Sequence, residues 1–177
     1  LLNDLFHWKL LGETQDDAVG EAFDKVARIL DLPYPGGPEI EKSARIGNPK
    51  AINFPRPMIK EKNFSFSFSG LKTAVLYYKK SLASHNETLN LNDVAASFQH
   101  AAFDVLVTKT TRAALHYGAK SIVLCGGVAA NQMLRAALKT ASEKYGCTFF
   151  APEFSYNTDN AAMIAVAAPM AMIGRYK

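Results

Sequence analysis

The fold is indicated by residues 120–135, which read Lys-Ser-Ile-Val-Leu-Cys-Gly-Gly-Val-Ala-Ala-Asn-Gln-Met-Leu-Arg. Residues 121–125 have a β-branched centre and are predicted to form a short buried strand. Residues 128–145 carry leucines at helical spacing and are predicted to form a helix. The two glycines between them place a helix N-terminus at the carboxyl end of a strand, where α/β sheets bind polar or anionic ligands.

Asn131 is predicted to lie one turn into this helix, where its carboxamide can donate and accept hydrogen bonds. Gly126 and Gly127 carry no Cβ, so a ligand can approach their backbone closely. The alternative is a tight strand-to-helix turn that binds nothing. A diglycine alone favours this alternative, because the pattern is short and common.

The 177 residues are enough for one domain with a real core, or one domain and part of another. The net charge of +4 allows an RNA or phosphate partner without requiring one. Cys125 and Cys147 are predicted to be small side chains buried in the protein. Two unpaired cysteines indicate a protein of a reducing compartment, the cytoplasm. Residues 161–174, the longest apolar stretch, are too short to span a bilayer, so no membrane association is expected. The chain starts at Leu1 without a signal peptide or a methionine, and we expect a fragment.

The rest of the pattern alternates predicted helices and strands. A strand or hairpin is predicted for residues 1–11, and strands are predicted for residues 64–68 and 147–150. Helices are predicted for residues 16–30, with Thr14 as N-cap, and for residues 39–46, 71–84, 92–117 and 161–172. This order predicts an α/β fold with a mostly parallel sheet.

Seven segments together carry a more specific signal. They read Asp-Asp-Ala-Val-Gly-Glu-Ala-Phe-Asp-Lys (16–25), Tyr-Pro-Gly-Gly-Pro (34–38), Phe-Pro-Arg-Pro (54–57), Phe-Ser-Phe-Ser-Phe-Ser-Gly-Leu-Lys-Thr-Ala (64–74), Ala-Ser-Phe-Gln (96–99), Gly-Gly-Val-Ala-Ala-Asn (126–131) and Thr-Asp-Asn-Ala-Ala-Met-Ile-Ala (158–165). In this order the segments resemble the bacterial TsaD family, the tRNA N6-adenosine threonylcarbamoyltransferases. The resemblance covers essentially the whole chain.

The resemblance implies an RNase H-like lobe of the sugar kinase, Hsp70 and actin superfamily, with an inserted helical segment. Residues 1–63 would be the end of the first lobe plus the inserted segment, and residues 64–177 would be the second lobe. The resemblance also implies an acyltransferase reaction. A threonylcarbamoyl group moves from threonylcarbamoyl-adenylate to N6 of the tRNA adenosine next to the anticodon, and AMP leaves.

The resemblance assigns roles to five residues. Asp24 matches the carboxylate that holds the ribose of the adenylate, and Gly37 and Asn131 match positions that contact the nucleoside. Glu41 matches a carboxylate of archaeal and eukaryotic members, at a position that varies among bacterial ones. Asp159 matches the one metal ligand from the second lobe, for a divalent ion, iron or zinc, that acts on oxygens of the adenylate as a Lewis acid.

Two features of the family are missing. The family's metal-binding histidines form a pair separated by three residues, which the four histidines here do not form, and its Gly-Gly-His-Thr phosphate loop is absent. The chain therefore resembles a C-terminal portion of the family. We expect it to be inactive alone, because Asp159 by itself does not make a metal site. The alternative role for Asp159 is a simple N-cap of the last helix.

The expected partners are tRNA, threonylcarbamoyl-adenylate, and TsaB-like and TsaE-like proteins. Arg56 and Lys72 are candidates for a tRNA-facing surface, against the alternative of a solvated surface. An exposed apolar lobe face is expected to favour a dimer or a partner.

Two other functions stay open, an ATP-dependent phosphotransferase of the same superfamily and a non-catalytic assembly subunit. Segments 20–25 and 69–73 do not belong to sugar kinases. Segments 127–131 and 158–160 are missing from TsaB-like subunits.

Overall fold

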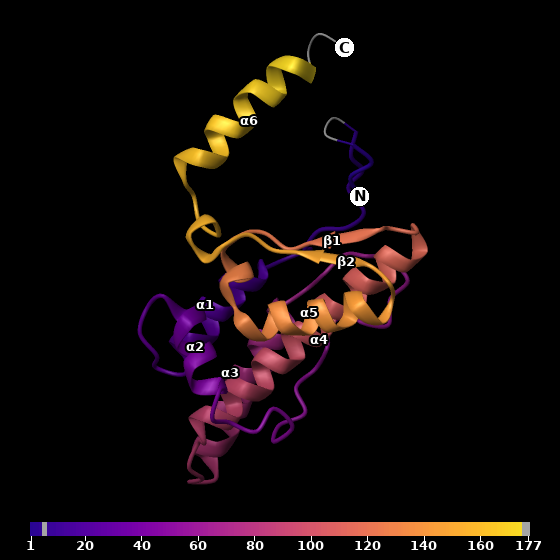
Figure 1. The fold of residues 1–177 in the computed structure, drawn as a ribbon. Helices are drawn as coiled ribbons and strands as arrows, with labels where there is room; N and C mark the ends of the chain where they lie inside the picture. The colour runs from indigo at the N-terminus through magenta and orange to yellow at the C-terminus, as the bar shows by residue number, and fades with distance from the viewer. Residues whose placement is uncertain (5–6, 175–177) are drawn as a thin grey trace.

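The computed structural model describes residues 1–4 and 7–174. Four helices come first: α1 (Val19–Ile29), α2 (Gly36–Ala44), α3 (Ser69–Ser84) and α4 (Leu91–His116). There follow β1 (Ser121–Val123), the 3-10 turn η1 (Gly127–Ala130), α5 (Gln132–Lys144), β2 (Thr148–Phe150), the 3-10 turn η2 (Phe154–Tyr156) and α6 (Ala161–Gly174). In Figure 1, α6 stands apart from the body formed by the other elements.

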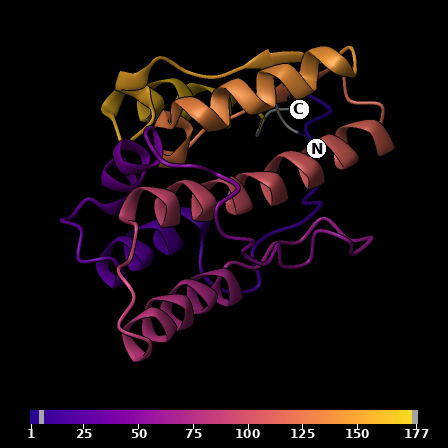
Figure 2. The ribbon, with the colours of Figure 1, turned by 90° about the horizontal axis from the view of Figure 1, so that it is seen from below.

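The long helix α4 is the centre of the hydrophobic core. It contacts α2, α3 and α5, and in Figure 2 it runs between α3 and α5. The ring centroid of Phe98 lies 4.9 Å from that of Phe23, and Phe103 lies 5.6 Å from the same ring. Each fully buried aromatic side chain stabilises the fold by about 1.5–3 kcal/mol, so this aromatic cluster fixes α1 against α4.

The two described strands form a small parallel sheet, in which Ile122 pairs with Phe149 and Val123 pairs with Phe150. Ile122 is buried against Ala114 of α4 and Cys147, so helices cover one face of the sheet. Val123 and Phe150 are 66% and 55% exposed on the other face. The prediction of an α/β fold with a parallel sheet is confirmed for these two strands.

The strand predicted for residues 64–68 is wrong. Phe66 makes only an isolated parallel bridge with Thr14, supported by hydrogen bonds from Phe66 N to Glu13 O and from Gln15 N to Phe66 O. The pairing stops there because Asp16 Oδ1 accepts the next amides, those of Phe68 and Ser69, at 2.8 and 3.2 Å. These amides begin α3 instead of continuing a ladder.

Several predicted helices exist with different starts. The first helix begins at Val19 with Ala18 as N-cap, and Thr14 instead bonds its own turn through Asp17 O at 2.9 Å. The short helix begins at Gly36, three residues before its predicted start. Residues 128–145 are not one helix, because the 3-10 turn η1 precedes α5.

Two further sequence predictions concern side chains and the N-terminus. Cys147 is buried as predicted, but Cys125 is exposed because it follows the end of β1 at the turn. Leu2 and Trp8 form an antiparallel bridge, which confirms a hairpin in the first residues, although Leu5 and Phe6 lie outside the described residues. Among the residues described, no helix is long and apolar enough to cross a membrane.

Candidate functional site

Asp24 anchors the turn that begins α2. Its Oδ1 accepts a hydrogen bond of 2.8 Å from the backbone N–H of Gly36. A Cβ on Gly36 would lie 2.5 Å from Cβ of Ala27 and 2.7 Å from Cα of Asp24, so only glycine fits this close approach. A Cβ on the next residue, Gly37, would have no heavy atom within 4 Å. The turn is therefore pinned to α1 while the backbone at Gly37 stays uncovered.

Glu41 connects α2 to the N-terminus of α5. Its Oε1 accepts a hydrogen bond of 3.2 Å from the backbone N–H of Gln132, in the first turn of α5. The side chain is only 14% exposed and also pairs with Arg45 at 3.5 Å. A carboxylate is favourable there because the first amides of a helix have no partner within the helix and carry a partial positive charge.

Asn131 is the N-cap of α5, not a residue one turn inside it. Its Oδ1 accepts the N–H of Leu134 at 3.1 Å, and its Nδ2 donates to Oε1 of Gln99 at 2.8 Å. The residue is 7% exposed. The helix starts later than the leucine spacing predicts because Gly126, at φ 89°, sends the backbone into the 3-10 turn first.

Four of the five predicted ligands thus gather at one place. Asp24 and Gly37 meet at the start of α2, and Glu41 joins that helix to the residue next to Asn131. The helix α1 also contacts both α2 and η1. Figure 1 shows α1 and α2 beside the beginning of α5, although their segments are far apart in the sequence. The result is the start of α2 beside Asp24 and the start of α5 at Asn131, with Glu41 in the second half of α2 as the link between the two helices.

Asp159 has no direct contact with this group. The preceding loop is held by Arg135 of α5, whose guanidinium donates to Pro152 O at 2.8 Å, to Asn157 Oδ1 at 3.2 Å and to Ala129 O. Asp159 itself is exposed. The predicted capping role is taken by its neighbour Asn160, whose Oδ1 accepts the N–H of Met163 at 3.0 Å.

A complete metal centre does not fit the residues present. Within residues 1–4 and 7–172, no group of three or more His, Cys, Asp and Glu side chains is placed to hold an ion. Structural zinc sites need four ligands and catalytic sites three. His100 is engaged with Arg56 at 3.0 Å and His7 with Asp4 at 2.9 Å. In this part of the chain, Asp159 is therefore one exposed carboxylate that belongs to no group of three candidate ligands.

Both basic candidates for a tRNA surface are already paired. Arg56 donates to Asp104 Oδ2 at 3.0 and 3.1 Å, and Lys72 lies 2.9 Å from Asp17. The pKa of Asp17 is lowered by the hydrogen bonds from Lys25 and Lys72. A phosphate group would have to compete with these carboxylates for the two cations.

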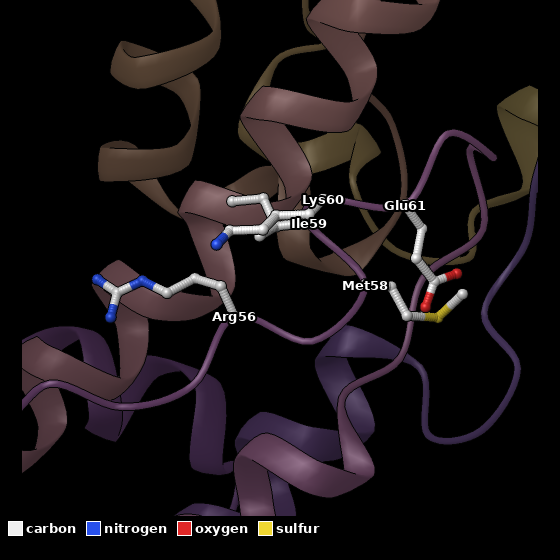
Figure 3. Close-up of a pocket in the computed structure, with 5 residues that line it drawn as sticks. All are labelled: Arg56, Met58, Ile59, Lys60 and Glu61. Atoms are coloured by element: carbon white, nitrogen blue, oxygen red, sulfur yellow. The ribbon is translucent and has the colours of Figure 1, made fainter.

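Two cavities lie elsewhere. One, of about 520 Å³, is lined by Arg56 and residues 58–61 (Figure 3). Another, of about 360 Å³, lies between α4 and α5 beside Leu115 and Tyr145. Neither cavity is lined by Asp24, Gly37, Glu41, Asn131 or Asp159.

Two structurally important residues were not predicted. Asp16 was predicted only as the first residue of a helix, yet its carboxylate accepts the amides that begin α3. Gln99 was assigned no role, yet it bonds Asn131. The only sequence signal for either residue is its place in one of the seven segments. Their partners lie 52 and 32 residues away.

Comparison with known proteins agrees with the resemblance. The model of the TsaD family, described as tRNA N6-adenosine threonylcarbamoyltransferase, matches residues 2–166. A protein of that name from Moorella thermoacetica is 58% identical over 160 residues, which are 90% of this chain and 47% of the relative. One from Thermosipho melanesiensis is 55% identical over 159 residues, 90% of this chain and 48% of the relative. The chain spans about half the length of the curated relatives it matches.

Proposed function

Because the chain belongs to the TsaD family of tRNA N6-adenosine threonylcarbamoyltransferases, we propose that it forms the part of such a transferase that holds the adenylate. The reaction transfers a threonylcarbamoyl group from threonylcarbamoyl-adenylate to N6 of the tRNA adenosine next to the anticodon. The N6 nitrogen attacks the carbonyl carbon, the bond from that carbon to the phosphate oxygen breaks, AMP leaves, and the N6 nitrogen loses a proton.

One observation carries the proposal, the hydrogen bond between Glu41 Oε1 and Gln132 N. It joins two segments about ninety residues apart and holds the second half of α2 against the first turn of α5, whose cap residue is Asn131. Amides at both helix starts already bond the side chains of Asp24, Glu41 and Asn131, so these side chains, together with the helix dipole, would hold a polar ligand. The ribose and base of an adenylate offer polar groups of this kind.

Each side chain has a definite task in this arrangement. Asp24 uses Oδ1 for the Gly36 amide, which leaves Oδ2 to accept a ribose hydroxyl. The uncovered backbone at Gly37 lets the flat base or the sugar lie against it. Asn131 has a second amide hydrogen and a second lone pair for the nucleoside. Glu41 holds α2 against the first turn of α5.

Further parts of the proposal concern the intact protein. The fold is an RNase H-like lobe with residues 1–63 as the inserted helical segment and end of the first lobe. Asp159 provides one ligand of a divalent ion, iron or zinc, and the other ligands come from outside the described residues. Arg56 and Lys72 border the tRNA surface. TsaB-like and TsaE-like proteins are the partners, and the cytoplasm is the location.

The test is AMP binding by calorimetry to the intact protein that carries this sequence. Asp24→Ala should weaken AMP binding by roughly 1–3 kcal/mol, the free energy lost when a bound polar group has no hydrogen-bond partner. Asp24→Asn keeps an acceptor for Gly36 but loses the charge, so it separates ribose binding from the integrity of the turn. Glu21→Ala, on the same helix and exposed, is the matched control and should bind AMP normally. Unchanged affinity in both Asp24 variants would remove Asp24 from the site.

A further inference from the structure

We infer that Gln99 is a positioning residue, which orients the Asn131 carboxamide for the nucleoside. Gln99 lies on α4, a helix that supplies none of the five predicted ligands. The inference rests on the proposed function for the identity of the ligand, whereas the contact between the two side chains stands independently of it.

The contact is buried and short. Gln99 is fully buried, and Asn131 is 7% exposed. Oε1 of Gln99 accepts the hydrogen bond from Nδ2 of Asn131 at 2.8 Å, and Nε2 of Gln99 lies 2.9 Å from the sulfur of Met133. In such a dry environment a hydrogen bond is strong, and a polar group without one is costly.

The direction of each hydrogen bond is fixed by the backbone. The N–H of Leu134 can only donate, so the Asn131 atom that faces it must be the oxygen. Nδ2 of Asn131 then has to face α4, where it needs an acceptor, and Oε1 of Gln99 supplies it. The amide group of Gln99 consequently points to Met133, whose thioether is a weak acceptor. A single orientation of both carboxamides follows from one helix-cap amide.

The orientation of the Asn131 carboxamide determines which hydrogen-bonding groups a ligand meets. With Gln99 present, Asn131 keeps one amide hydrogen and one oxygen lone pair in fixed directions. Without the acceptor on α4, only the Leu134 amide holds the carboxamide, and the Nδ2 end can swing about that one hydrogen bond. The direction of the amide hydrogens offered to a base or ribose is then no longer fixed. A misplaced polar group costs binding even when it stays in the site.

Two substitutions separate orientation from packing. Gln99→Met preserves length and apolar contacts but replaces the carbonyl oxygen with a thioether, a far weaker acceptor. Gln99→Glu preserves an oxygen that can accept from Nδ2 in either protonation state. Ser97→Ala is the matched control, because Ser97 is equally buried on α4 but bonds Ile52 N and Asn48 O instead of Asn131.

Two measurements are made on the intact protein, the ¹⁵N–¹H signals of the Asn131 side-chain amide and the dissociation constant for AMP. Gln99→Met should move the Asn131 amide signals and weaken AMP binding roughly tenfold, the value of about one net hydrogen bond. Gln99→Glu should retain most of the affinity. Ser97→Ala should leave both the signals and the affinity unchanged.

The outcomes separate the inference from the proposed function. Unmoved Asn131 signals in Gln99→Met would overturn the positioning role, as would an equal loss of AMP affinity in Ser97→Ala. Moved signals with unchanged AMP affinity would support the positioning role and count against Asn131 as a nucleoside ligand. Should Gln99→Met not fold, Gln99→Glu decides alone. It should shift the Asn131 amide signals slightly while AMP still binds, and loss of AMP binding with unmoved signals contradicts the inference.

Discussion

Asp16 accepts hydrogen bonds from the hydroxyls of Ser67 and Ser69 at 2.5 and 2.6 Å and from the amides of Phe68 and Ser69 at 2.8 and 3.2 Å. Burial acts to raise the pKa of the carboxyl group, but these hydrogen bonds outweigh it and lower the pKa to about 2. One side chain before α1 therefore fixes the start of α3. Segments 16–25 and 64–74 meet through this contact.

Asp16→Ala should lower the free energy of unfolding by about 1 kcal/mol near neutral pH, as expected for the loss of a helix cap. The folded pKa of Asp16, about 2, lies below the value of about 3.9 for an unfolded aspartate. The ionised carboxylate therefore stabilises the fold above about pH 4, and this contribution is lost as the pH falls toward 2.

Urea unfolding of the parent and of Asp16→Ala, at neutral pH and between about pH 4 and 2, measures this effect. The two free energies should converge in the acid range. Glu143→Ala is the control, because Glu143 is exposed on α5. A difference between parent and Asp16→Ala that does not change with pH would contradict the assignment.

The helix α5 holds two loops at its N-terminal end. Arg135 donates to Ala129 O in η1 and to Pro152 O and Asn157 Oδ1 in the loop before α6. Its guanidinium also lies 4.4 Å from the centre of the Phe154 ring, a cation–π distance. Thus α5 fixes the loop that leads to Asp159 relative to the cap residue Asn131.

Arg135→Ala should release residues 152–157 without unfolding α5. Hydrogen bonds to charged groups contribute about 1.5–3 kcal/mol, so amide hydrogen exchange in this loop should accelerate by roughly tenfold or more. Arg135→Lys should restore the loop only in part, because an ammonium cannot donate in the fork geometry of a guanidinium. Lys139→Ala, at an exposed site on the same helix, is the control. Unchanged exchange in residues 152–157 would show that Arg135 does not hold the loop.

At the scale of the whole molecule, polar and apolar surfaces are distributed unevenly. The predicted ligands lie between helix ends, while Val123 and Phe150 are exposed on the open face of the sheet. The residues of α6 from 161 to 172 are exposed too. These exposed apolar side chains lie in the part of the chain that the structure describes, and a lobe face that favours a dimer or a partner stays a prediction. Asp159 lies between η2 and α6 and belongs to no group of three or more candidate metal ligands in that part.

The chain as given should bind no divalent metal tightly and should not modify tRNA. A metal site generally requires three or more protein ligands, and Asp159 is one. Elemental analysis after incubation with Fe²⁺ or Zn²⁺ and a threonylcarbamoyl transfer assay check this expectation, with Asp159→Asn as the matched variant. Stoichiometric metal that disappears in Asp159→Asn would mean that the chain builds a site from its own residues.

The sequence predicted the helices with fair accuracy, because helical periodicity and capping residues act over a few neighbouring positions. It predicted 92–117 and 161–172 nearly to the residue. The seven segments also predicted the TsaD family, whose model matches residues 2–166. Residues 64–68 were misjudged because alternation of Phe and Ser has the period of a strand, whether or not a second strand is available to pair with it.

The arrangement of the candidate site could not be predicted in the same way. Asn131 became a cap because Gly126 adopts a positive φ, and its orientation depends on Gln99, 32 residues away. Glu41 was predicted as a ligand on resemblance, but its hydrogen bond to Gln132 depends on how α2 and α5 each pack against α4. Hydrogen bonds act only at about 3 Å, so residues distant in sequence can form them only after the hydrophobic core has placed their helices.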